Sequence, residues 1–144
     1  MWSQDRTCFD VLLHVSRAVF DGLAPVAAAL ERVAARGIVV TARAHADEPF
    51  AFVSRFFGPR AGVMEDPVTG SAHCALAPYW LEAVPAAGGG GAAAAARADG
   101  DGFVPARQAS TRGGDVRVRV AGDRVRLRGG AVVVQAGSLL RLGR

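Results

Sequence analysis

A polar run at positions 65–73 holds the side chains of this sequence best suited to chemistry. Gly70 stands directly before an apolar stretch that we interpret as a buried helix, and Thr69 or Ser71 is placed to cap it. Glycine also lets the backbone approach a ligand closely. Because the first N–H groups of a helix are free and the positive end of its dipole lies there, this position predicts a site for an anion such as a carboxylate or phosphate.

Two acidic residues and a histidine flank this predicted anion site. Asp66 and Glu65 lie four and five residues before Gly70, and His73 falls in the first helical turn. An acid or base beside a bound carboxylate suits proton transfer at the carbon next to that carboxylate.

The same residues also have plainer structural interpretations. An Asp-Pro pair usually begins a turn, and a glycine before a helix is usually part of one. A lone histidine beside an apolar helix is more often a hydrogen-bonded core residue than a catalyst. Glu65 is a candidate ion-pair partner for Arg55 or Arg60. The functional interpretation therefore depends on the run as a whole.

The first sixty residues predict the framework around this run. Positions 8–16, 38–43 and 51–57 are short and rich in apolar or β-branched residues, which indicates strands. Positions 23–36 have apolar residues at helical spacing, and Gly37 follows where a helix C-cap is expected, so we predict a helix there.

The stretch that begins at Ser71 is apolar almost all round, which is typical of a buried helix. Pro78 within it predicts a bend or an early end. We interpret Cys74 as a small buried apolar residue. Positions 85–102 are Gly- and Ala-rich, and we predict a flexible surface insertion to which we assign no function.

Valine and arginine alternate over 116–128 around a turn at 121–123, which predicts a hairpin with one apolar face and one arginine face. Further strands are expected at 131–135 and 138–142. The arginine face could contact nucleic-acid phosphates, but no aromatic residue follows Arg107 to stack on bases. A solvated strand face is the commoner explanation, so we do not expect a nucleic-acid partner.

Composition narrows the class of protein further. The chain has 144 residues, of which 51% are hydrophobic and 21% charged, and this excludes an intrinsically disordered chain. No apolar run approaches the twenty residues that span a bilayer, and no secretory signal is evident. All 17 basic residues are arginine, so the net charge of +4 partly reflects coding bias. Two cysteines cannot form a disulfide scaffold and no zinc-ligand spacing occurs, so we expect a cytoplasmic protein without a metal.

The segment 53–80 resembles the PhzF-like family, the phenazine-biosynthesis-like proteins, which are related in fold to diaminopimelate epimerase. The run EDPVTGSAHCAL at 65–76 carries the resemblance most specifically. The run QASTRGG at 108–114 and the run GDRVRLRGGAVVV at 122–134 also match the family pattern. The resemblance covers nearly the whole chain apart from the insertion at 85–102.

The resemblance implies an α+β fold in which a curved, barrel-like mixed β-sheet wraps around a buried central helix. Family members have two such lobes, and the substrate lies between them at the N-termini of the two central helices. Their chemistry is cofactor-independent removal and return of a proton at carbon, and the phenazine enzyme acts on a dihydro-hydroxyanthranilate. Carried over by motif, Asp66 is the catalytic acidic group, and Gly70 with Ser71 binds polar groups of the substrate. The resemblance assigns no role to His73. From their place beside the predicted anion site, we add Thr69 and His73 as substrate-binding residues.

One part of the family pattern is not found here. The N-terminal lobe of the family supplies a glutamate base and a Gly-His motif, and neither occurs in this sequence. We therefore interpret residues 1–144 as a single C-terminal lobe without the N-terminal lobe. We expect an isomerase- or epimerase-type lobe that binds a small carboxylate and is incomplete alone, or alternatively a non-catalytic binding module. A lone lobe exposes apolar surface, so self-association or pairing with a second lobe is expected.

Overall fold

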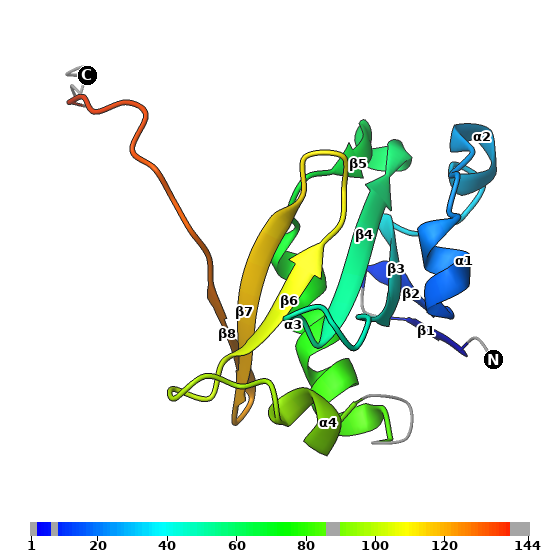
Figure 1. Cartoon of the computed structure of the whole chain (residues 1–144). Helices are drawn as coiled ribbons and strands as arrows, with labels where there is room; N and C mark the ends of the chain where they lie inside the picture. The colour runs from blue at the N-terminus through cyan, green and yellow to red at the C-terminus, as the bar shows by residue number, and fades with distance from the viewer. Residues whose placement is uncertain (1–2, 7–8, 86–89, 139–144) are drawn as a thin grey trace.

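Strands that are apolar on both sides build the centre of the sheet. The computed structural model describes residues 3–6, 9–85 and 90–138. Within these, the strands form one mixed sheet in the order β1-β2-β3-β4-β6-β7-β8, and β5 pairs with β4 outside this path (Figure 1). The strands are β1 Ser3–Arg6, β2 Asp10–His14, β3 Gly37–Arg43, β4 Phe52–Gly58, β5 Val63–Asp66, β6 Val104–Gln108, β7 Gly114–Ala121 and β8 Arg124–Arg128.

Short helices flank a longer one. α3 spans Gly70–Pro78 and continues directly as the π-helix η2, Tyr79–Ala83. It packs against β7 and β8. The shorter helices are α1 Arg17–Asp21, α2 Ala27–Leu30, η1 Pro59–Ala61 and α4 Ala92–Ala95. No helix among the described residues is long and apolar enough to cross a membrane.

Strand periodicity sorts the apolar residues of β3 and β4 between two cores. Val39 and Phe52 pack with Leu76 and Trp80 of α3 and η2. The alternate residues, Val40 among them, form a second cluster with Phe20 of α1 on the opposite face. Both faces are covered, which explains why these strands are almost continuously apolar. The predicted α+β fold, a curved mixed sheet around a buried helix, is thus confirmed.

Trp80 anchors the helix to the sheet. Its ring stacks on Phe52 with 5.6 Å between centroids and 3° between planes. Its indole Nε1–H donates to the Thr41 hydroxyl at 3.0 Å, and that hydroxyl donates to the Val53 carbonyl at 2.7 Å. The one polar atom of this large side chain is therefore satisfied inside the core.

The helix predicted at 23–36 is wrong over most of its length. Only α2 is helical there, and α1 lies earlier, begun by Ser16, whose hydroxyl accepts from Val19 N–H. Gly37 begins β3 rather than capping a helix. A Cβ on Gly37 would lie 2.2 Å from the Phe56 ring, so close packing explains the glycine. Leu30 and Val33 still contribute their apolar side chains to the second core.

Two further expectations also need correction. Cys74 is exposed, because the residues of α3 that turn toward the core are Ala72, His73, Leu76 and Ala77. The strand predicted at 131–135 is absent: this stretch leaves the body of the protein without pairing (Figure 1). The neighbouring prediction at 138–142 falls mostly outside the described residues.

Three predicted strands and the predicted hairpin agree with the structure. The strands at 8–16, 38–43 and 51–57 correspond to β2, β3 and β4, and the hairpin is formed by β7 and β8 around a Gly122-Asp123 turn. The α-helical hydrogen-bond pattern changes at Pro78, but the helical segment continues as η2. Within the Gly/Ala-rich insertion, α4 buries Ala94, and Arg97 donates to the Glu48 carbonyl at 2.7 Å, so this part packs on the body instead of lying free on the surface.

Replacing Phe52 by alanine tests the stacking core. Phe52 is fully buried against Trp80, so Phe52→Ala is expected to lower the free energy of unfolding by about 3–5 kcal/mol. The matched control Val19→Ala removes an exposed side chain and is expected to change it by less than about 0.5 kcal/mol. Urea titration followed by tryptophan fluorescence measures both, and equal effects would contradict this packing.

Candidate functional site

A fully buried glutamine shapes the turn that carries the predicted site. Gln108, the last residue of β6, lies beneath the turn between β5 and α3. Its Nε2 donates to the Asp66 carbonyl at 2.6 Å and to the Thr69 hydroxyl at 3.1 Å, and its Oε1 accepts from Thr69 N–H at 2.7 Å. One side chain thus makes three hydrogen bonds to the turn and satisfies two of its backbone groups.

The Asp66 carboxylate is fixed by the same network. The Thr69 hydroxyl, which accepts from Gln108, donates in turn to Asp66 Oδ2. Ser110 supports the turn from the other side, because its hydroxyl donates to the Pro67 carbonyl at 2.8 Å. Asp66 is therefore held at one position beside the start of α3.

The N-terminus of α3 carries no side-chain cap. Thr69 occupies the N-cap position, but its hydroxyl is directed to Asp66 and makes no capping hydrogen bond. The first N–H groups of a helix have no intrahelical partner. Gly70 and Ser71 are exposed, so their N–H groups are available to an anion, and the helix dipole adds positive potential there.

Arg36 brings a positive charge to this helix end. Its guanidinium donates to the Ser71 hydroxyl at 3.1 Å and holds the buried Asp10 carboxylate with bonds of 2.9 and 2.5 Å. Arg36 is anchored from β2 by this ion pair, and its side chain is 41% exposed. An anion at Ser71 would therefore also meet the guanidinium.

His73 lies inside the core. It is fully buried, and its Nδ1 lies 2.8 Å from the Thr69 carbonyl. Since a carbonyl only accepts, Nδ1 carries the proton and the neutral ring leaves Nε2 as an acceptor. Nε2 has no hydrogen-bond partner among the described residues. Burial lowers the pKa of His73, and the contact with Thr69 opposes this shift in part.

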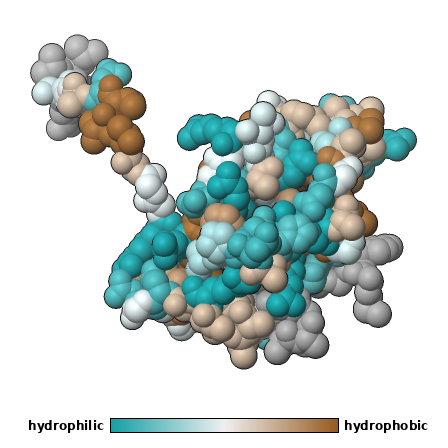
Figure 2. Space-filling model, viewed as in Figure 1, coloured by the Kyte–Doolittle hydropathy of each residue, from teal (hydrophilic) through white to brown (hydrophobic). Residues whose placement is uncertain are grey.

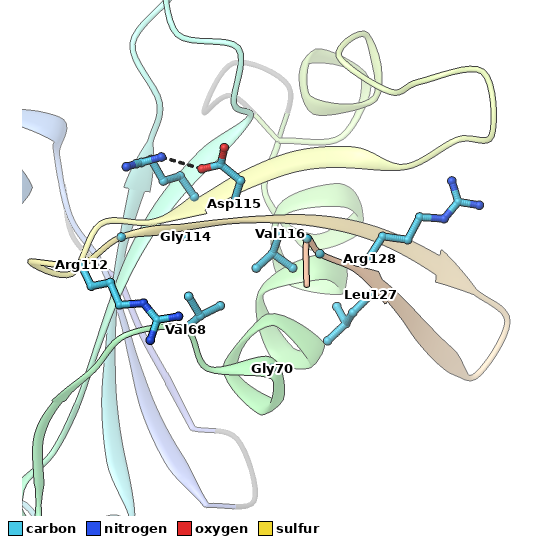
Figure 3. Close-up of a pocket in the computed structure, with 12 residues that line it drawn as sticks. Val68, Gly70, Arg112, Gly114, Asp115, Val116, Leu127 and Arg128 are labelled. Atoms are coloured by element: carbon cyan, nitrogen blue, oxygen red, sulfur yellow. Dashed lines mark hydrogen bonds and ion pairs between the residues drawn. The ribbon is translucent and has the colours of Figure 1, made fainter. Parts of the chain in front are cut away.

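Two hollows flank the helix end. A cavity of about 150 Å³ is lined by residues that include Arg36, Asp66, Thr69 and Ser71. A larger, open hollow of about 770 Å³ lies between the β7–β8 hairpin and the turn before α3. Figure 3 shows Arg112 at one end of this larger hollow and the apolar side chains of Val68, Val116 and Leu127 along it.

The structure brings most of the predicted site residues together. Asp66, Thr69 and Ser71 share the smaller cavity, and Gly70 lines the larger hollow. His73 lines neither of them. Asp66 as a catalytic group and the other four as substrate-binding residues stay predictions.

Glu65 follows its plainer interpretation. Its carboxylate accepts two hydrogen bonds from Arg55, at 2.7 and 3.0 Å. This ion pair links β5 to β4.

Among the described residues, no group of three or more His, Cys, Asp or Glu side chains comes together that could hold a metal ion.

Gln108, Arg36 and Asp10 are the site-supporting residues that sequence reasoning missed. For Gln108 a signal exists: Val104, Ala106 and Gln108 alternate along β6 and are all buried. A polar residue at the inward position of a strand needs buried partners. The pairing of Arg36 with Asp10 joins residues 26 positions apart and has no comparable local signal.

Three arginines of the hairpin face contact other parts of the chain. Arg117 pairs with Asp99 at 3.1 Å, and Arg128 pairs with Asp101 at 2.8 Å. Arg119 donates to the Asp101 carbonyl at 2.7 Å and lies over the Phe103 ring. These contacts favour a structural role for this face over phosphate binding.

Replacing Gln108 tests the support of the turn. Gln108→Leu keeps an apolar stem of similar size but leaves Thr69 N–H and the Asp66 carbonyl unpaired, so we expect a loss of about 1–3 kcal/mol in the free energy of unfolding. Amide hydrogen exchange at Thr69 should become faster. The control Ser110→Ala removes one hydrogen bond of the same turn and should leave the Thr69 amide protected. Unchanged exchange in Gln108→Leu would contradict the role given to Gln108.

Burial of His73 predicts acid sensitivity. Its pKa in the folded protein lies below the ordinary 6.5, so the unfolded chain binds more protons as pH falls through that value. Stability is therefore full above pH 6.5 and decreases below it. His14, whose pKa is also lowered chiefly by burial, acts in the same direction. In denaturation curves from pH 8 to pH 5, His73→Asn should reduce the slope of unfolding free energy against pH, and an unchanged slope would contradict this role of His73.

Comparison with known proteins adds a match along most of the chain. The family model for the phenazine biosynthesis-like proteins, PhzC-PhzF, matches residues 8–137. An uncharacterized isomerase of Pseudomonas aeruginosa is 42% identical over 129 residues, covering 90% of this chain and 42% of that protein. An uncharacterized isomerase of Halalkalibacterium halodurans is 40% identical over 136 residues, covering 94% of this chain and 45% of that protein.

A solved structure shares the fold. A crystal structure from Clostridium difficile, described as a phenazine biosynthesis PhzC/PhzF protein, matches with a TM-score of 0.66 and 32% identity, covering 90% of this chain and 44% of that one. The chain therefore spans less than half the length of the relatives it matches.

Proposed function

Because this chain belongs to the phenazine biosynthesis-like family, we propose that it forms one half of the active site of an isomerase that moves a proton at a carbon next to a carboxylate. The observation that carries the proposal is the Asp66 carboxylate, fixed by Thr69 and Gln108 beside the uncapped N-terminus of α3. Two matched relatives are described as isomerases.

The first step is binding of a small carboxylate. Its oxygens would accept from the N–H groups of the exposed residues Gly70 and Ser71, where the helix dipole favours negative charge. The Ser71 hydroxyl and Arg36, 3.1 Å apart, provide further donors. Gly70 contributes backbone without a side chain, so a ligand can come close.

The second step is proton transfer at the neighbouring carbon. When a base removes that proton, negative charge spreads from the carbon onto the bound carboxylate. The same N–H groups then stabilise more charge than in the ground state, which is the condition for lowering the barrier. Asp66 lines the same cavity and is the group on this lobe that would exchange a proton or hold a donor group of the substrate.

A second lobe completes this site in the proposal. Of the residues that line the smaller cavity, only Arg36 and Asp66 carry titratable side chains. Moving a proton from one position to another is simplest with two acid–base groups, and arginine does not release its proton. A cavity of about 150 Å³ is also smaller than the several hundred Å³ typical of ligand sites. A partner lobe would supply the other base and the missing wall.

The alternative is a binding module without catalysis, because the second base is not among the residues lining the cavity. Binding without proton exchange would favour it.

We also place the protein in the cytoplasm as part of the proposal, since Cys74 is an exposed free thiol and such thiols persist in reducing compartments.

A matched ligand pair tests the anion site. Millimolar benzoate is expected to shift the backbone amide resonances of Gly70 and Ser71 in ¹H–¹⁵N spectra, whereas neutral benzamide is not. Ser71→Ala should weaken benzoate binding several-fold. The control Asp123→Asn, in the exposed β7–β8 turn, should leave it unchanged. Equal shifts with both ligands would contradict an anion site.

Solvent exchange tests the chemistry. In D₂O, small carboxylic acids with a C–H next to the carboxylate should gain one mass unit when the chain is present with the lobe that completes its site. Asp66→Asn should lower this rate at least tenfold, and Asp123→Asn should not. No exchange in the completed assembly would refute the isomerase, while benzoate binding would still establish the anion site.

A further inference from the structure

We propose that Asp10 sets the charge selectivity of the anion site at the start of α3. By neutralising Arg36, it makes the site bind ligands with one negative charge and reject ligands with two. This inference rests on the proposed function, because it concerns the same cavity. It narrows the ligand from anions in general to monoanions such as carboxylates, and it assigns a specificity-determining role to a residue that does not touch the ligand.

The Arg36 guanidinium is fixed at the edge of the cavity by contacts on several sides. Its Nε and Nη2 donate to the two carboxylate oxygens of Asp10 at 2.9 and 2.5 Å. The guanidinium carbon also lies 5.5 Å from the ring centroid of Phe9 and 5.9 Å from that of Phe56. An arginine that is paired bidentately and placed over aromatic rings is held in one orientation. Arg36 therefore meets a ligand in this cavity, which it lines, without first changing its conformation.

Asp10 acts on the cavity through Arg36 and is not among its lining residues. The Asp10 side chain is 4% exposed, whereas that of Arg36 is 41% exposed. The same Nη2 atom donates to Asp10 and to the Ser71 hydroxyl, so the buried carboxylate lies within two hydrogen-bond lengths of that hydroxyl. Since water and salt screen buried charges only weakly, Asp10 lowers the positive potential that Arg36 offers to a ligand.

The charges around the cavity leave no surplus positive charge for a dianion. Among the described lining residues, Arg36 and Asp66 are the charged ones, and Asp10 lies behind Arg36. One cation is therefore present with two carboxylates. A ligand with a single charge can still be held, because the backbone N–H groups, the Ser71 hydroxyl and the helix dipole attract it without a formal charge. A second charge on the ligand would be repelled by both carboxylates, with no further cation to offset it.

Selectivity of this kind suits the proposed reaction. The N-terminus of a helix binds phosphates and carboxylates alike, so the α3 N–H groups alone do not distinguish them. A carboxylate bonded to the reacting carbon can take up the negative charge that forms there, whereas a phosphate ester attached through oxygen cannot. Rejecting an unsuitable ligand by unfavourable charge is a common route to specificity. Asp10 thus keeps unreactive dianions out of the site.

Phenyl sulfate and phenyl phosphate are matched probes of this selectivity. They have the same shape, but at pH 8 the sulfate carries one negative charge, while the phosphate, whose second pKa is about 6, carries nearly two. In titrations followed at the Gly70 and Ser71 amides, the wild-type chain should have an at least tenfold lower dissociation constant for phenyl sulfate. Asp10→Asn keeps a hydrogen-bond acceptor for Arg36 but removes the charge, and should reduce this preference to less than threefold.

Two further variants separate charge from structure. The double variant Asp10→Asn/Arg36→Gln removes both charges of the pair and leaves the net charge of the site unchanged, so the preference for phenyl sulfate should again be at least tenfold. Glu48→Gln is the matched control, because it takes a carboxylate from Arg17, and Glu48 follows the opposite end of β3 from Arg36. It should leave the preference as in the wild-type chain. Circular dichroism should show the same fold in every variant.

Binding elsewhere on the surface would give a different signal. Hydrophilic residues gather at the lower left of Figure 2, over the β7–β8 hairpin, where Arg124 and Arg126 are exposed. Anions attracted to these arginines would shift the amides of β8 and leave those of Gly70 and Ser71 unchanged. The titrations therefore distinguish the proposed site from general attraction to a basic surface.

Several outcomes would overturn the inference. These are equal affinities of the wild-type chain for the two probes, a tenfold sulfate preference that survives in Asp10→Asn, or loss of that preference in the double variant. The wild-type comparison decides even if Asp10→Asn does not fold. Benzoate binding at Gly70 and Ser71 without the expected sulfate preference would remove the role of Asp10 alone, whereas no benzoate binding would remove the anion site itself. The two failures are thus distinguishable.

Discussion

The side-chain amide of Gln108 is the interaction on which the candidate site depends. It is buried at the end of β6 and makes three hydrogen bonds to the turn between β5 and α3, where Thr69 lies 39 residues earlier in the sequence. A buried amide has almost no alternative partners, so its hydrogen bonds set the turn in one conformation. Because the Thr69 hydroxyl is part of this network, it is turned toward Asp66 and away from the helix end. The same constraint therefore positions the carboxylate and leaves the helix N-terminus open.

The two cores of the sheet make this arrangement rigid. β3 and β4 are covered on one face by α3 and η2 and on the other by the shorter N-terminal helices. Trp80, stacked on Phe52, fixes the far end of the helical segment, while its first turn is fixed through His73 and Thr69. α3 is thus held at both ends, and its N-terminal N–H groups keep one direction. Preorganised donors of this kind bind charge without reorganising.

Sequence patterns predict the central strands, the buried helix and the hairpin, since these depend on local alternation and on apolar stretches. The motif at 65–73 also predicts the place of Asp66 at the start of α3. Patterns fail where tertiary contacts decide. Helical spacing at 23–36 produces only α2. Arg36 N–H instead donates a hydrogen bond to the Phe9 carbonyl at 2.8 Å, and Gly37 begins β3. The valines at 132–134 favour a strand, but a strand also needs a neighbour, and none of the described segments pairs with them. Arg36 and Ser71 are 35 positions apart in the sequence and meet only in the folded protein, so sequence spacing does not predict their hydrogen bond.

The small size of the cavity at Asp66 has a thermodynamic consequence. When one face of a ligand site belongs to each of two bodies, a ligand that contacts both faces must bind the assembled state more tightly than the separate ones. Affinity for the ligand then depends on protein concentration, and the ligand strengthens assembly by the same factor. Dilution alone would weaken binding without any change in the residues around Asp66. With the proposed second lobe in place, recognition and association at this cavity would form a single linked equilibrium.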